Sequence, residues 1–194
     1  MNKKPTKNAD NLVEYRVTKE GAAQSQLETA IWLWVTKDDP ISIHTLAGAS
    51  NDILDALGAK IGQPSLRSEW LKRQPKWLQK RVREAQNFFK HGFRDIVGKK
   101  QPYFSVEAEI LMFDSVLCWK LRFKKQPLPP MLQLFGAFTV INHFDVAGRE
   151  EWPFLFDSLD VEKLRRLDRL KFFKEGLQAL AEAGFTPLPP QRAL

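Results

Sequence analysis

Apolar residues recur at helical spacing along almost the whole of this 194-residue chain, and this periodicity constrains the fold most strongly. In one segment Leu27, Ala30, Ile31, Trp34 and Val35 follow the i, i+3, i+4, i+7, i+8 pattern of a single buried helix face. The sequence contains no Asn-Gly or Asp-Gly hairpin signal and no sustained alternation of apolar and polar residues. It therefore predicts an all-α fold, a compact bundle of five to six helices in a single domain.

Turn and cap residues divide this pattern into separate helices. Asp39 followed by Pro40 is typical of an N-cap and a first helical residue, so a second helix begins there. Pro75 and Gly92 delimit a third helix. The remaining stripes predict a fourth helix over about 106–123, with Val106, Ile110, Phe113, Leu117 and Leu121 inward, and a sixth over about 161–183. A fifth helix over about 131–144 is apolar nearly all round, so we expect it in the middle of the fold.

Composition limits the class of protein. Residues 1–10 are polar and basic and predict a disordered N-terminus, residues 11–185 form the helical domain, and residues 186–194 are a Pro-rich, extended tail.

No apolar run reaches the roughly 18 residues needed to span a bilayer, so we expect no membrane partner and a cytoplasmic location. A single cysteine, Cys118, excludes an intrachain disulfide, and we expect it in the core. Without a glycine-rich phosphate loop or metal-ligand spacing, we expect no cofactor and no metal.

Positive charge is concentrated in one part of the chain. Residues 67–100 contain eleven Lys and Arg against three Asp and Glu, a net charge of +8, whereas the whole chain carries +7. Such a segment attracts phosphate backbones or acidic partners, although a solvated helix face has the same composition. The candidate nucleic-acid-binding residues are Arg73, Lys76, Lys80, Arg81, Arg83 and Arg94.

The same segment holds a candidate catalytic cluster. Asn87 and His91 are four residues apart, so they share a helix face, and this is not the face of the apolar residues. A histidine that titrates near neutral pH is the usual general acid or base. Asp95 follows closely enough to hold the imidazole, and Lys90 could steady a phosphate.

The stretch QNFFKHGFRD resembles the signature of the HEPN superfamily, helical domains found in many ribonuclease toxins and phage-defence proteins. Asn87 matches the polar residue of that motif and His91 its histidine, whereas Gln86 stands where the family has arginine. The resemblance implies metal-independent RNA cleavage, with His91 as acid or base and Asn87 orienting His91 or the phosphate. Either Lys90 or Arg83 would replace the arginine, or the activity would be lost. The resemblance also implies a dimer in which the two motif helices meet across a two-fold axis.

Ser42 and His44, at the start of the second helix, form a second candidate cluster that could bind an anion. A lone histidine in this position is more often a buried structural residue. The sequence leaves two functions open. The first is a HEPN-like endoribonuclease of a toxin or phage-defence system. The second is a non-catalytic helical module that binds RNA or an acidic protein through residues 67–100. RNA and a homodimeric or hetero-oligomeric partner are the expected partners.

Overall fold

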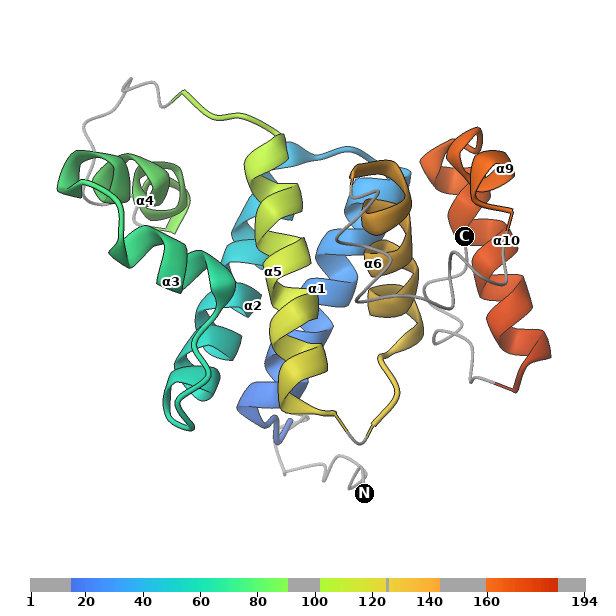
Figure 1. The fold of residues 1–194 in the computed structure, drawn as a ribbon, viewed down its shortest axis with the longest axis horizontal. Helices are drawn as coiled ribbons and strands as arrows, with labels where there is room; N and C mark the ends of the chain where they lie inside the picture. Colours follow the sequence, from blue (N-terminus) through green and yellow to red (C-terminus); the bar gives the residue numbers. More distant parts are fainter. Residues whose placement is uncertain (1–14, 91–101, 125, 144–159, 185–194) are drawn as a thin grey trace, which may run out of the picture.

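The computed structural model describes residues 15–90, 102–124, 126–143 and 160–184. Within these ranges the regular structure is entirely helical (Figure 1). The eight helices described are α1 (Lys19–Thr36), α2 (Pro40–Ala59), α3 (Leu66–Lys72), α4 (Lys76–Lys90), α5 (Val106–Arg122), α6 (Pro130–His143), α9 (Val161–Arg165) and α10 (Arg169–Glu182). The all-α prediction is confirmed, whereas the expected number of five to six helices is too low.

Two local signals account for the additional helices. Ser65 caps a short helix, α3, which lies between the predicted second and third helices, and its hydroxyl accepts a hydrogen bond from Ser68 N at 3.0 Å. The predicted sixth helix is divided, because Asp168 accepts a hydrogen bond from Lys171 N at 2.9 Å and begins α10. An aspartate stabilises a helix from its N-cap and destabilises it from its interior. Asp168 interrupts the apolar stripe and therefore begins a new helix.

The helices form an elongated bundle with a different pair at each end (Figure 1). α1 and α2 pack side by side, and α5 packs along α2. Asp39 separates α1 from α2 and caps α2 by accepting a hydrogen bond from Ser42 N at 3.2 Å, as the sequence predicted. α6 contacts α1, α5, α9 and α10. In Figure 1, α3 and α4 lie at one end of the long axis and α9 and α10 at the other.

The core extends over α1, α2, α5, α6 and α10, and an aromatic cluster joins α1, α6 and α10. The indole of Trp34 meets the rings of Phe135, Phe138 and Phe173 edge to face, with centroids 5.2, 5.3 and 6.3 Å away. Such pairs add stability beyond the area that they bury. Most residues of α6 are buried, which confirms the expectation of a helix that is apolar nearly all round.

The predicted orientation of α5 is wrong. Val106, Ile110 and Leu121, which the sequence placed in the core, have exposed fractions of 53%, 53% and 42%. The buried apolar residues of this helix are instead Ala108, Leu111, Met112, Val116 and Trp119. α5 has apolar residues on two sides, and periodicity does not tell which side faces the neighbouring helices.

The predicted disordered N-terminus, residues 1–10, and the Pro-rich tail, residues 186–194, lie outside the described residues. The domain boundaries at 11 and 185 therefore stay a prediction. Among the described helices, none is both long enough and apolar enough to cross a membrane.

Candidate nucleic-acid interface

α4 presents a basic face to solvent. Lys76, Lys80, Arg83 and Asn87 follow the i, i+4, i+7, i+11 spacing of one helix face, and all four are exposed. We call these four residues the α4 basic face. Asn87, the first residue of the predicted catalytic pair, therefore lies in line with three cationic side chains and points away from the core.

An exposed tryptophan lies beside the α4 basic face. Trp77 has an exposed fraction of 67%, and its helix neighbours at i+3 and i+4 are Lys80 and Arg81. Arg81 is exposed. Glu84, the acidic residue of α4, lies four residues after Lys80 and is half-buried. The indole of Trp77 was not among the residues that the sequence singled out. The sequence feature that could have identified Trp77 is its position directly after Lys76 in a run of basic residues.

α3 extends the same kind of surface. Trp70 has an exposed fraction of 49%, and Arg73, the C-cap residue of α3, is exposed. Apart from Lys72, which is paired with Glu69, two exposed tryptophans and five exposed basic residues thus lie on two consecutive helices at one end of the molecule. The basic residues are Arg73, Lys76, Lys80, Arg81 and Arg83. We call these residues, together with Asn87, the α3–α4 surface.

Gln86 is the deeply buried polar residue of α4, with an exposed fraction of 6%. Its Nε2 donates to Gly48 O at 3.2 Å and to Asp52 Oδ2 at 2.9 Å, both on α2. The two helices approach closely at this point, because a Cβ atom on Gly48 would lie 2.9 Å from Gln86 Nε2. The residue at the arginine position of the HEPN signature therefore faces α2, away from the exposed side chain of Asn87.

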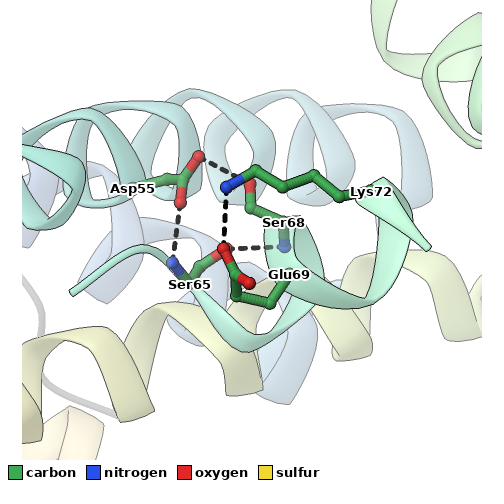
Figure 2. Close-up of polar contacts among 5 residues, drawn as sticks. All are labelled: Asp55, Ser65, Ser68, Glu69 and Lys72. Carbon is green, nitrogen blue, oxygen red and sulfur yellow. Dashed lines mark hydrogen bonds and ion pairs between the residues drawn. The ribbon is translucent and has the colours of Figure 1, made fainter. Parts of the chain in front are cut away.

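A carboxylate on α2 holds the start of α3 (Figure 2). Asp55 Oδ1 accepts from Ser65 N at 2.7 Å, and Asp55 Oδ2 accepts from the Ser68 hydroxyl at 2.6 Å. Further along α3, Lys72 Nζ lies 2.7 Å from Glu69 Oε1. Hydrogen bonds to an ionised acceptor are stronger than neutral ones, so Asp55 fixes the position of α3 against the bundle.

A second buried carboxylate connects three helices. Asp114 of α5 accepts from Asn51 Nδ2 at 2.8 Å and from Arg67 N at 3.1 Å. The half-buried guanidinium of Arg67 is stabilised electrostatically by Asp114, Asp52 and Asp55, while desolvation by burial lowers its pKa. Arg67 therefore belongs to the internal network and not to the basic surface. The sequence did not single out this network, because its members are far apart along the chain.

The second predicted cluster, Ser42 and His44, lies in a different environment. Hydrogen bonds from the hydroxyl and from the backbone N–H of Ser42 to the carboxylate of Asp39 lower the pKa of Asp39. His44 has an exposed fraction of 1%, and its ring lies 5.4 Å from Phe89 and 5.0 Å from Tyr103 between centroids. Its Nε2 lies 3.9 Å from Glu107 Oε2. These contacts favour a structural role for His44 over anion binding.

A pocket of about 320 Å³ lies where α1, α2, α5, α6 and α10 converge. Its charged residues contact other residues of the wall. The guanidinium of Arg169 lies 4.7 Å from the Trp34 ring centroid and 3.7 Å from Asp38 Oδ1. Trp34 Nε1 donates to Glu109 Oε1 at 3.2 Å. The pocket is therefore a polar junction between α10 and the bundle.

His91, Arg94 and Asp95 lie outside the described residues, as does the side chain of Lys90. Burial, together with the charges of Asp114 and Asp55, raises the pKa of the Cys118 thiol far above its ordinary value and disfavours the thiolate at neutral pH. In the described part of the chain, no group of three or more His, Cys, Asp or Glu residues could hold a metal ion.

No protein-family model matches the chain, and no curated protein or solved structure resembles it at a significant level. The likeness to the HEPN signature therefore rests on the residues around Asn87 alone and stays a prediction.

Proposed function

We propose that this protein binds single-stranded RNA through the α3–α4 surface. The observation that carries the proposal is the position of the exposed indole of Trp77 beside the α4 basic face. The concentration of positive charge in residues 67–100 points to a polyanionic partner.

The α4 basic face supplies contacts to phosphates. Lys76, Lys80 and Arg83 are spaced by one helical turn each, about 5.4 Å, so they form a line of cations along the helix. Flexible lysine and arginine side chains neutralise phosphates without reading sequence, and they release counterions on binding. The exposed amide of Asn87 adds a hydrogen-bond donor and acceptor at the end of this line.

Trp77 and Trp70 distinguish a single strand from a duplex or an acidic protein. Unpaired bases stack on exposed aromatic rings next to a positively charged groove or face, whereas the bases of a duplex are already stacked on each other. Tryptophans also anchor protein partners, but a line of cations beside exposed indoles matches the alternation of phosphates and bases in one strand. The surface therefore fits a single strand best.

Binding to fluorescein-labelled oligouridine of about 20 nucleotides, followed by fluorescence anisotropy, tests the proposal. We expect Trp77→Ala to weaken binding roughly 5- to 150-fold, because stacking contributes about 1–3 kcal/mol per base. A second variant, Lys76→Gln/Lys80→Gln, removes two positive charges from the α4 basic face. Its matched control is Lys171→Gln/Lys174→Gln on α10, which removes two positive charges at the opposite end of the molecule.

Equal weakening by the α10 control and by Lys76→Gln/Lys80→Gln would mean that RNA responds only to net charge and would reject the α3–α4 surface. Oligothymidine and duplex RNA of the same length complete the comparison. Preference for duplex over single strand would contradict the role of the indoles, and equal binding of oligothymidine would widen the ligand to single-stranded nucleic acid in general.

The metal-independent endoribonuclease that the HEPN resemblance implies is the second candidate. The exposure of Asn87 in line with three cationic side chains favours this candidate. Against it, Gln86 stands at the position of the family's arginine, and its side chain is buried and does not lie on the exposed face of Asn87. Incubation of the protein with total RNA in EDTA, beside a His91→Ala variant, tests this candidate. Cleavage by the wild type that is lost in the variant would support catalysis, and equally intact RNA in both would reject it.

A further inference from the structure

The pocket between α10 and the bundle reaches from the core to the surface. Its wall includes the buried residues Trp34, Ile43 and Ala108 and the exposed residues Asp38 and Ser105. Its volume of about 320 Å³ lies at the lower end of the roughly 300–1,000 Å³ of small-molecule sites. The pocket is therefore accessible from solvent and large enough for a small ligand.

The wall of this pocket carries negative charge, although the chain as a whole carries +7. Its acidic residues are Asp38 and Glu109 and its basic residue is Arg169, which gives a net charge of −1. The phenol of Tyr103 lies in the same wall. Burial, and then the charges of nearby carboxylates that include Glu109 and Asp38, raise the pKa of this phenol. The pocket therefore favours a cation over an anion of the same size.

Glu109 has capacity for a further hydrogen bond. It is half-buried, and Trp34 Nε1 donates to its Oε1 at 3.2 Å. Among the described residues, none donates to its Oε2. An ionised carboxylate accepts hydrogen bonds at both oxygens, so Oε2 is available to a ligand. Asp38 Oδ1 lies 3.7 Å from Arg169 Nη1, which is longer than a hydrogen bond, so this carboxylate has capacity as well.

Aromatic rings form much of the remaining wall. Trp34, Tyr103 and Phe138 line the pocket. The electron-rich faces of such rings attract organic cations, and their bodies contact alkyl groups. The chain itself provides an example, because the guanidinium of Arg169 lies 4.7 Å from the centroid of the Trp34 ring. A metal ion would need several oxygen ligands, whereas an alkylammonium ion matches a wall of carboxylates and rings.

We propose that this pocket binds a small organic ammonium ion. Its N–H groups donate to Glu109 Oε2, its alkyl part contacts the aromatic wall, and Asp38 adds negative charge at the rim. A single ammonium group balances the net charge of the wall. The proposal does not depend on RNA binding, because the pocket and the α3–α4 surface have no residue in common.

Titration of the ¹⁵N-labelled full chain with n-butylammonium chloride tests the proposal. The indole N–H of Trp34 reports on the site, because it donates to Glu109. We expect its NMR signal to shift saturably with a Kd of about 1 mM. The controls are n-butanol and n-butanoate, which have the same chain without the positive charge. No saturable shift with the ammonium ion below about 20 mM, or an equal shift with either control, overturns the proposal.

A free amine and a lysine side chain of a second protein present the same ammonium group. The peptide Gly-Gly-Lys-Gly-Gly, titrated in the same way, separates the two sources. Tighter binding of the peptide than of n-butylammonium would assign the pocket to a lysine side chain, and weaker binding would assign it to a free amine.

A pair of variants tests the role of the carboxylate. Glu109→Gln should raise the Kd for n-butylammonium at least about 10-fold, because a hydrogen bond to a charged group is lost. The amide oxygen can still accept from Trp34 Nε1, so the wall keeps its structure, which circular dichroism verifies. The matched control is Glu162→Gln on α9, which removes an exposed carboxylate outside the pocket. We expect an unchanged Kd for this control, and equal weakening by both variants overturns the proposal.

Discussion

Replacement of Asp114 by Asn should destabilise the fold by about 3 kcal/mol. The carboxylate accepts hydrogen bonds from Asn51 Nδ2 and Arg67 N, and it is the largest electrostatic stabiliser of the half-buried Arg67 guanidinium. Hydrogen bonds to a charged acceptor contribute about 1.5–3 kcal/mol, and a buried charge that loses its partner costs about 3–5 kcal/mol. Asp52 and Asp55 still face Arg67, so the loss stays at the lower end of this range.

Urea denaturation followed by circular dichroism measures this loss. With a slope near 2 kcal/mol/M, a loss of about 3 kcal/mol lowers the urea midpoint by about 1.5 M. The control is Glu162→Gln, which removes an exposed ion pair with Arg165 on α9 and should cost less than about 1 kcal/mol.

A double-mutant cycle separates the charge pair from simple loss of packing. If Asp114 compensates the charge of Arg67, then Arg67→Met/Asp114→Asn is more stable than the sum of the two single losses predicts. A loss below about 1 kcal/mol for Asp114→Asn, or additive losses in the double variant, would refute the assignment of Asp114 as the partner of Arg67.

Three other predictions follow from single residues. Burial, together with nearby carboxylates, raises the pKa of Tyr103 to about 12, so in a Tyr15→Phe variant the phenolate absorbance of the folded protein should appear near pH 12. Since the unfolded phenol ionises near pH 10, stability should fall as the pH rises from about 10 to about 12, and a folded midpoint near 10 would contradict the burial of Tyr103. The raised pKa of Cys118 predicts slow reaction with a thiol reagent at pH 8 that becomes fast in urea; equal rates would be inconsistent with its burial. Gly58→Ala should destabilise the fold by about 1–3 kcal/mol, because the new Cβ would collide with the backbone oxygen of Gln63, and an unchanged melting temperature would refute this contact.

The sequence predicted the features of the fold that local chemistry determines. The N-cap at Asp39 and the bounds of α5 follow from cap residues and from the spacing of apolar residues. α6 was expected to lie centrally because it is apolar nearly all round, and its burial follows from composition alone. Each of these features depends on residues within one helix and its ends.

Features that depend on tertiary contacts could not be predicted. The outer side of α5 has the stronger apolar stripe, yet the bundle covers the opposite side, where Met112 and Trp119 pack. Gln86 is buried because Gly48 on a different helix lets it approach a carbonyl oxygen. Asp114 and Arg67 are 47 residues apart in the chain, so their hydrogen bond has no signature in the local sequence.

The candidate site was predicted in part. Asn87 is exposed, as its position off the apolar face indicated, and its spacing from Lys76, Lys80 and Arg83 puts all four on one face. A role of these residues in catalysis or in nucleic-acid binding stays a prediction. Trp77 was missed, because an aromatic residue in a helical stripe is ordinarily expected in the core.

The salt dependence of RNA binding tests the α3–α4 surface most directly. A plot of the logarithm of the binding constant against the logarithm of the salt concentration falls by about 0.7 per phosphate contact for a single strand. Lys76→Gln/Lys80→Gln/Arg83→Gln should therefore make the slope shallower by about 2, whereas Lys163→Gln/Lys171→Gln/Lys174→Gln, on α9 and α10, should leave it unchanged. The same slope in the wild type and both triple variants would contradict binding of RNA through α4.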